Sequence, residues 1–417
     1  MNDKASIKKN IFFLLFVQGT NYLFPLLTFP YISHIIGPDG FGKIALSQAI
    51  ITYLMFVIDF GFNLTITRRI SIYHKDGNEQ GIRKLFICTI CAKLIIFMMV
   101  ITITTPVIFL IDKLRELRFL VLMGYLSLIG SVFFPVWYFQ GIQKMKGIAI
   151  ASSGAKILCI AAVFILVRNE DDLLYVMFIY SLNFLTAALV SLFYIKKDFF
   201  YIRPEYSIVK KIVVDAFPIF VSYIGSSIYT TVNVFFLGLF LPASQVGLYS
   251  SGDKIRAVAQ NVLSPISQAV FPNLSSYIYD RKKFNKKHKK YSLYFLMVSF
   301  SISLLLFIFS QRIVSILLDS RFNDSYKILM VLAFLPFVVS IAIVFGQWGL
   351  VNIGKQNVLS KIYLISGMFH LVHIFFAIHF FGGIGAAYSV LFTESFVSLL
   401  MIIFFIKYNK EYYDDGR

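Results

Sequence analysis

The chain has 417 residues, of which 58% are apolar and only 14% are charged, and its formal net charge is +18. Soluble domains carry roughly 25% charged residues, so this composition excludes an ordinary soluble enzyme or binding domain. The apolar residues gather in stretches of about twenty, the length that crosses a hydrocarbon core roughly 30 Å thick. The sequence therefore predicts an all-α integral membrane protein.

About twelve such stretches follow one another along the chain, separated by charged residues or by Gly and Pro. The first six are expected near residues 11–36, 43–66, 85–111, 119–140, 147–167 and 173–195. The second six are expected near residues 212–238, 246–270, 291–310, 326–349, 357–380 and 384–406. The first stretch is too long for a cleavable signal, and no small-residue cleavage site follows it.

The loops carry an uneven positive charge. If the N-terminus is inside, the inner segments hold 26 Lys and Arg residues, and eight lie in or at the edge of outer loops. Because cytoplasmic loops are enriched in Lys and Arg, both termini are expected in the cytoplasm. A basic run then lies on the inner side, where it favours anionic lipid headgroups over nucleic acid: Arg281, Lys282, Lys283, Lys286, Lys287, Lys289 and Lys290.

The two sets of six stretches resemble each other. Each begins with a helix that carries a proline, Pro25 or Pro218, and Gly42 of the first set aligns with Gly247 of the second at an offset of about 205. Parallel repeats are common in transporters, which place the substrate between the halves. We therefore expect two six-helix bundles related by a pseudo-twofold repeat, residues 1–200 and 201–417, with the linker at 196–211.

Polar side chains form stripes on three of the predicted helices when the residues are placed at 100° intervals. A polar stripe facing lipid is costly, so it indicates a water-filled cavity or a polar contact between helices. For the Ser and Thr members alone, hydrogen bonding between helices is the favoured explanation. For Asp59, and for Asp253 with Arg256, a cavity is favoured. The stripes comprise Gln48, Thr52, Asp59 and Asn63; Asp215, Ser222, Ser226, Tyr229 and Asn233; and Asp253, Arg256, Gln260, Ser264 and Ser267.

Several charged residues are expected deep in the membrane, where each needs a compensating partner or a function. The positive ones outnumber the negative ones, which favours a cavity for an anionic substrate, since phosphate oxygens accept charge-assisted hydrogen bonds. Alternatively, Lys93 and Lys156 pair with Asp59 or with backbone carbonyls. The deep groups are Asp59, Lys93, Lys156, Asp253, Lys254, Arg256 and Glu394, with Arg68 and Arg69 at the inner mouth.

The last two predicted helices form a hairpin that turns near Gly382, which places His370 and Glu394 at similar depth. His373 lies one turn from His370 on the same face. A buried Glu beside a His can exchange protons near neutral pH. The three residues are therefore candidates for proton coupling, with a purely structural hydrogen bond as the alternative.

Four segments carry a family resemblance: PLLTFPYISHIIGPDGFG (25–42), DFGFNLTITRRIS (59–71), PVWYFQGIQKMK (135–146) and VGLYSSGDKI (246–255). The chain resembles Wzx-type O-antigen flippases, the polysaccharide transport branch of the MATE-like exporter superfamily. The resemblance implies that the chain moves an undecaprenyl-pyrophosphate-linked O-antigen or capsular oligosaccharide to the periplasmic leaflet of the inner membrane, by alternating access. It also implies a central cationic cavity, membrane lipids as surroundings, and a polysaccharide polymerase and a chain-length regulator as partners.

By this resemblance, Lys254, Arg256 and Lys93 are candidates for pyrophosphate or acidic-sugar contact, with Lys156 as a further candidate, and Asp59, Arg68 and Arg69 would line the inner entrance. A cation-coupled small-molecule exporter of the same fold is the alternative and would favour a cavity rich in carboxylates. A lipid II flippase is usually described with two more helices. No nucleotide or metal motif and no large outer loop is evident, which argues against an enzyme; no cofactor and no metal are expected.

Overall fold

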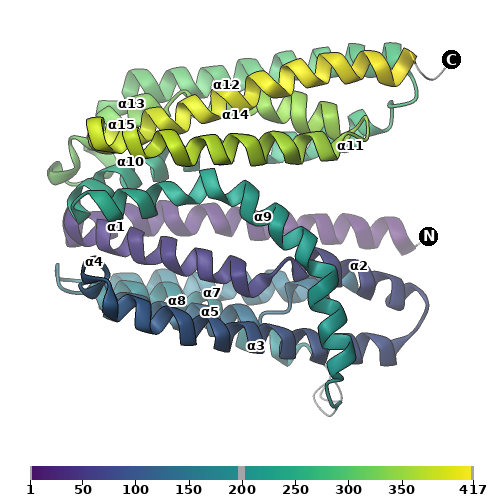
Figure 1. The fold of residues 1–417 in the computed structure, drawn as a ribbon, viewed down its shortest axis with the longest axis horizontal. Coiled ribbons are helices and arrows are strands. Elements are labelled where there is room, and N and C mark those ends of the chain that lie inside the picture. Colours follow the sequence, from purple (N-terminus) through teal and green to yellow (C-terminus); the bar gives the residue numbers. More distant parts are fainter. Residues whose placement is uncertain (1, 196–201, 415–417) are drawn as a thin grey trace. The chain divides into compact units, whose positions relative to one another are not determined.

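The protein is described from a computed structural model that covers residues 2–195 and 202–414, and these residues contain helices and no strand (Figure 1). The helices before the gap are α1 (Asn2–Asp59), α2 (Phe62–Lys75), α3 (Glu79–Leu110), α4 (Asp112–Arg115), α5 (Arg118–Phe133), α6 (Val136–Gly141), α7 (Met145–Leu166) and α8 (Leu173–Phe193). Those after it are α9 (Tyr206–Phe240), α10 (Ala243–Asn261), α11 (Ser264–Ser275), α12 (Arg281–Leu317), η2 (Ser320–Phe322), α13 (Ser325–Leu332), α14 (Leu335–Ala342), η3 (Ile343–Val351) and α15 (Gln356–Asp414).

The chain divides into two compact units. Unit 1 comprises residues 1–36 and 43–224, and unit 2 comprises residues 37–42 and 225–417. The division after residue 224 falls inside α9, whereas the predicted linker at 196–211 lies partly outside the described residues. The division of the sequence into repeats at residue 200 stays a prediction, because a repeat and a compact unit need not share a boundary.

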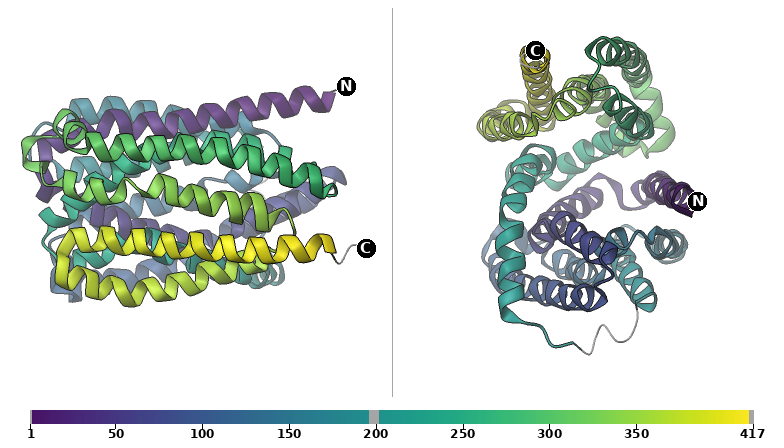
Figure 2. Two further views of the ribbon diagram at one scale, coloured as in Figure 1. Left: turned by 90° about the horizontal axis from the view of Figure 1, so that it is seen from above. Right: turned by 90° about the vertical axis from the view of Figure 1, so that its right-hand side faces the viewer.

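In unit 1, α3, α5, α7 and α8 run roughly parallel, as the end-on view in Figure 2 shows. Small residues allow α5 and α8 to approach closely. A Cβ added to Gly130 would lie 2.5 Å from the backbone carbon of Phe184, and Ser127 Oγ donates to Ser181 Oγ at 3.0 Å. Close helix packing through small and hydroxyl residues is typical of membrane bundles.

The first helical stretch is interrupted twice. Gly37 has φ 63° and ψ −178°, which breaks α1 into two segments. Phe60 at φ 47° and Gly61 at φ 77° then separate α1 from α2. Positive φ is costly for a residue with a side chain, so Phe60 needs support. Its ring stacks on Phe220 with the ring centroids 4.2 Å apart.

Unit 2 has two buried clusters, one around Trp348 and Phe295 and one around Leu332 and Ile374. Several of its helices are irregular. α10 and α11 are separated at Val262 and Leu263, α13 ends just before Pro336, and η3 is a π-helix. Breaks and π-helices leave backbone groups that neighbouring side chains can satisfy, and they are frequent at functional sites.

Each of the twelve predicted apolar stretches lies mostly on helix in the described residues, and four of them contain a break, at 60–61, 134–135, 262–263 or 333–334. By length and composition, eight helical stretches of the described chain could cross a membrane. Two of these, Phe24–Lys75 and Gln356–Tyr412, each span a pair of predicted stretches and contain a non-helical glycine, Gly37 or Gly382. The chain is thus a multi-pass membrane protein, while the count of twelve and the orientation of the termini stay predictions.

The glycines that align in the two predicted repeats, Gly42 and Gly247, contact each other's helical segments within unit 2. A Cβ on Gly42 would overlap the carbonyl oxygen of Ala243, and a Cβ on Gly247 would overlap the carbonyl oxygen of Pro38. Each contact joins a glycine to the residue four positions before the other glycine. Such reciprocity is the property of a contact around a twofold axis.

Candidate functional site

Unit 2 encloses a polar cavity of about 280 Å³. Its polar lining comes from α9, α10 and α15, and its apolar lining comes from α14, the start of η3 and Val390 of α15. The described lining residues are Asn233, Tyr249, Asp253, Arg256, Gln260, Leu335, Val339, Ala342, Ile343, Tyr363, Val390 and Glu394. Asn233, Asp253, Arg256, Gln260 and Glu394 are predicted site residues, so the structure brings five of them together.

Three of these residues form a charged network along one face of α10. Arg256 Nε donates to Asp253 Oδ1 at 3.0 Å, Arg256 Nη2 forms an ion pair with the same oxygen, and Nη1 donates to Gln260 Oε1 at 2.6 Å. A spacing of three or four residues places side chains on one helix face. These three residues of the predicted stripe therefore line the cavity, whereas Ser267, on α11, is buried and accepts from Trp348 Nε1 at 3.0 Å.

The described lining of this cavity is not itself cationic, and the central cationic cavity expected from the sequence stays a prediction. One guanidinium, Arg256, faces two carboxylates, Asp253 and Glu394. Lys254 points elsewhere because adjacent residues on a helix are about 100° apart, and its ammonium lies 5.2 Å from the ring centroid of Phe41. The prediction was based on the number of deep charges along the chain, and that number does not show which of them line the same cavity.

The two histidines lie beside this cavity in a chain of hydrogen bonds. His370 Nε2 contacts Asn233 Oδ1 at 2.8 Å, and His370 Nδ1 contacts Thr393 Oγ1 at 2.7 Å. His373 Nε2 contacts Thr393 Oγ1 at 3.0 Å, and Ser389 Oγ contacts His373 Nδ1 at 2.8 Å. The pairing of residue 370 with residue 393 confirms that the two sides of the Gly382 hairpin match in depth.

The single hydroxyl proton of Thr393 has two acceptors within reach, His370 Nδ1 at 2.7 Å and the carbonyl of Ser389 at 2.9 Å. When it points to His370, both imidazoles can be neutral, with Ser389 donating to His373, His373 donating to Thr393 and His370 donating to Asn233. The two histidines are therefore joined through Thr393 and not through Glu394. Glu394 is the next residue along α15, and its side chain lines the cavity. The direct Glu–His contact considered from the sequence is replaced by this chain.

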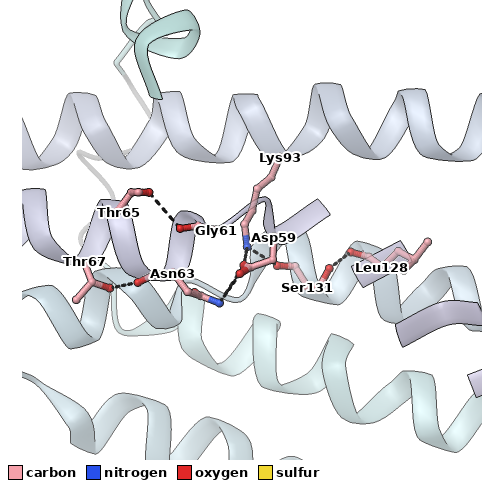
Figure 3. A network of polar contacts seen from close by, with 8 residues as sticks. All are labelled: Asp59, Gly61, Asn63, Thr65, Thr67, Lys93, Leu128 and Ser131. Atoms are coloured by element: carbon pink, nitrogen blue, oxygen red, sulfur yellow. Dashed lines mark hydrogen bonds and ion pairs between the residues drawn. The ribbon is translucent and has the colours of Figure 1, made fainter. Parts of the chain in front are cut away.

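In unit 1, Asp59 and Lys93 form a buried ion pair at the break between α1 and α2 (Figure 3). Lys93 Nζ donates to Asp59 Oδ1 at 3.0 Å and to the carbonyl of Ser131 at 3.3 Å. Asn63 Nδ2 donates to both carboxylate oxygens at 2.9 Å. The alternative in which Lys93 pairs with Asp59 and a backbone carbonyl is confirmed, and a role for Lys93 in substrate contact loses its support.

Arg68 and Arg69 face different grooves of unit 1, because consecutive helical side chains diverge. Arg68 lines a groove of about 700 Å³ with His74, Lys75 and Gly141. Arg69 lines a groove of about 500 Å³ and pairs with Asp215 of α9. The two arginines therefore do not form one anion clamp.

The remaining predicted residues are dispersed. Lys156 is buried in α7, where its Nζ donates to Ser152 Oγ at 2.9 Å. Gln48 lies against the hydroxyl of Tyr180. The side chain of Tyr229, like those of Ser222 and Ser226, lies outside the described residues. No group of three or more His, Cys, Asp or Glu residues suited to a metal ion occurs in the described part of the chain.

Sequence reasoning missed Tyr249, Tyr363 and Thr393. Tyr249 could have been found, because it precedes Asp253 by four residues and so extends the stripe of Arg256 and Gln260 by one turn. Thr393 adjoins Glu394 but carries no charge to single it out. Tyr363 lines the cavity because of the way α15 packs, and no local sequence pattern predicts that packing.

Comparisons of sequence identify relatives over almost the whole chain. A family model described as polysaccharide biosynthesis protein matches residues 7–278. A protein of Shigella dysenteriae, provisionally described as an O-antigen transporter, is 30% identical over 404 residues, which cover 95% of this chain and 99% of that protein. A protein of Escherichia coli (strain K12) with the same description is 30% identical over 411 residues, covering 98% of each.

Solved structures of the same fold include transporters and a flippase. An inward-facing multidrug resistance MATE family transporter of the MOP superfamily aligns with a TM-score of 0.75 at 12% identity, covering 95% of this chain and 96% of that one. The lipid II flippase MurJ, in an inward closed conformation, aligns with a TM-score of 0.73 at 14% identity, covering 94% and 86%. The extent of these matches identifies the chain as a multi-pass membrane protein of the polysaccharide biosynthesis protein family, with the fold of MATE-like transporters.

Proposed function

We propose that the protein is a flippase for an undecaprenyl-pyrophosphate-linked O-antigen or capsular oligosaccharide. It would move this lipid from the cytoplasmic to the periplasmic leaflet of the inner membrane by alternating access. The family membership and the description of the two relatives support a role in O-antigen transport. Both termini would lie in the cytoplasm, and a polymerase and a chain-length regulator would use the product.

The observation that carries the proposal is the polar cavity of unit 2. Charged groups inside a membrane protein are costly and persist where they serve a pathway, and Asp253, Arg256 and Glu394 share this space. The cavity volume of about 280 Å³ is just below the roughly 300–1,000 Å³ of common ligand pockets. It is therefore suited to one part of the substrate, such as a single sugar, or to a coupling ion with water.

We propose that Glu394 carries a coupling proton. Its carboxylate faces Arg256 across a cavity in a helix-lined interior, and the chain of hydroxyls and imidazoles from Ser389 to Asn233 ends on a residue of the same cavity. Protonation of Glu394 would release Arg256 from one of its two carboxylates. The guanidinium would then be available to an anionic group of the substrate.

The repeat supports alternating access. The reciprocal contact of Gly42 and Gly247 follows an offset of 205 residues, the same offset that relates the two halves of the sequence. Parallel repeats allow one half to rock against the other around a site between them. On this proposal, residues 1–200 and 201–417 are the two repeats.

The direct test is a flux assay with the purified full-length chain in sealed vesicles. The vesicles carry a fluorescent undecaprenyl-pyrophosphate-linked oligosaccharide, and a membrane-impermeant quencher reports which leaflet it occupies. We expect wild-type protein to move the probe and Arg256→Ala to move it at least about tenfold more slowly, the loss expected for one charge-assisted contact. Equal flux with and without protein contradicts the proposal.

A cation-coupled exporter of small molecules is the second candidate. The observation in its favour is the pair of carboxylates, Asp253 and Glu394, in the described cavity lining. Such an exporter would protect cells from cationic dyes, and its loss would leave surface polysaccharide unchanged. Measuring both phenotypes in one deletion strain separates the candidates.

A further inference from the structure

A second site in unit 1 combines positive charge with an apolar wall. It is the groove of about 500 Å³ next to Arg69, formed by α2, α3 and the start of α9. Its lining includes the cations Arg69, Lys84 and Lys211 and the apolar side chains Ile72, Leu85 and Ile208.

Two of the three cations already contact carboxylates. Arg69 pairs with Asp215, and Lys84 Nζ donates to Glu205 Oε1 at 2.6 Å. These pairs are accessible to water, with 39% of the Asp215 side chain and 47% of the Glu205 side chain exposed. Ion pairs that are accessible to water contribute little to stability, so a ligand with more negative charge can replace the carboxylates.

From this arrangement we infer that the groove binds the pyrophosphate of a polyprenyl lipid. The phosphate oxygens accept hydrogen bonds from Arg69, Lys84 and Lys211, and the first isoprene units lie along Ile72 and Ile208. Arg presents a planar pair of donors to a phosphate, and Lys presents a point charge. A free sugar would leave the cations unused, and a free inorganic anion would leave the apolar wall unused.

This inference rests on the proposed function, because it assigns a position to one part of the proposed substrate. It places the lipid-phosphate end in a groove of unit 1 that differs from the polar cavity of unit 2. Asp215 and Glu205 act there as internal competitors, since they occupy Arg69 and Lys84 when no ligand is bound. Removing a competitor should tighten binding, whereas removing a cation should weaken it.

The test uses the purified full-length protein in detergent with geranylgeranyl pyrophosphate as the probe, measured by calorimetry. Lys211→Ala should weaken binding about tenfold, the loss of one charge-assisted contact. Asp215→Asn should strengthen binding about threefold, because it frees Arg69 from a partner worth under 1 kcal/mol. Lys210→Ala is the matched control, because Lys210 is exposed and is absent from the described groove lining, and it should change binding less than about twofold.

Three competitors define which part of the probe is recognised. Inorganic pyrophosphate and geranylgeraniol should each bind more weakly than the probe, because each satisfies only one half of the groove. Dioleoylphosphatidylglycerol at the same concentration should leave the probe bound. Displacement by that lipid would reassign the groove to ordinary membrane headgroups and overturn the inference, as would equal binding by the Lys211 and Lys210 variants or weaker binding by Asp215→Asn.

The vesicle flux assay distinguishes a failure of the groove assignment from a failure of the proposed flippase function. If wild-type protein moves the lipid-linked oligosaccharide and Lys211→Ala moves it equally fast with unchanged probe affinity, the groove assignment fails and the function stands. If the groove variants change affinity as expected but wild-type protein moves no oligosaccharide, the flippase function fails and the lipid-pyrophosphate site stands.

Discussion

Gly42 and Gly247 each lie where a methyl group would overlap a backbone carbonyl near the other glycine, the carbonyl of Ala243 or of Pro38. Backbone cannot move aside as the end of a flexible side chain can, so both positions require glycine. This pair agrees with the predicted internal repeat, because the two contacts interchange under the offset of 205 residues.

Gly247→Ala should therefore destabilise the protein by about 1–3 kcal/mol, the usual cost of overpacking. The measurement is the midpoint of thermal unfolding in detergent, followed by intrinsic fluorescence. Gly154→Ala is the control, because a Cβ at that helical position meets nothing within 4 Å and Ala is the better helix former. An equal midpoint for the two variants would show that the contact at Gly247 is looser than described.

Arg256→Ala should reduce surface polysaccharide at normal protein level, because the guanidinium is the one cation in the described cavity lining. Lys254→Ala should have a much smaller effect, since its ammonium lies over the Phe41 ring. The two residues lie two positions apart on α10, and each variant removes one positive charge, so the variants control for each other. Polymer is measured by gel analysis of extracted lipopolysaccharide. Comparable losses of polymer in the two variants would contradict a specific role for the cation in the cavity.

Glu394→Gln should make flux insensitive to an imposed proton gradient, because an amide cannot carry the coupling proton. The readout is flux in vesicles with and without a pH difference across the membrane. Ser395→Ala is a suitable control, because Ser395 is exposed and its hydroxyl bonds only to the backbone of its own helix in the described contacts. Gradient-driven flux that persists in Glu394→Gln would assign Glu394 a structural role.

Lys93→Met should destabilise the protein by about 3 kcal/mol, at the low end for breaking a buried ion pair, because Asp59 keeps 25% of its side chain exposed and two bonds from Asn63. Adding Asp59→Asn to Lys93→Met should recover most of that loss, since it removes the uncompensated charge. Unfolding midpoints of the two single variants and the double variant give the coupling. Additive effects would contradict a direct pair.

Much of the helical architecture could be predicted from the sequence. In a membrane, each apolar stretch must form its backbone hydrogen bonds within itself, so a long apolar stretch predicts a helix without knowledge of the neighbouring helices. The stripe of Asp253, Arg256 and Gln260 was likewise visible, since one helix face fixes its geometry. The breaks between helical segments could not be predicted in this way. Phe60 takes a positive φ, and its ring is held against Phe217 and Phe220 of α9. These contacts join residues nearly 160 positions apart or more.

The charge of the cavity could not be predicted for a related reason. Lys93, Lys254 and Arg256 look equivalent along the chain, yet one pairs with Asp59, one lies over an aromatic ring and one faces two carboxylates. Their partners come from other helices, and the side on which each helix packs decides which cation reaches which space. Hydropathy fixes the depth of a residue in the membrane, and packing fixes its neighbours.

The chain from Ser389 to Asn233 has one further consequence. The Thr393 hydroxyl has one proton and two acceptors within reach, the His370 imidazole and the carbonyl of Ser389. When the proton points to the carbonyl, both imidazoles can donate to the Thr393 oxygen, and His370 then turns an unprotonated nitrogen toward Asn233. The rotation of one hydroxyl thus decides whether the amide of Asn233 accepts from His370 with its oxygen or donates to it with its nitrogen, and so which end of that amide is left for the cavity.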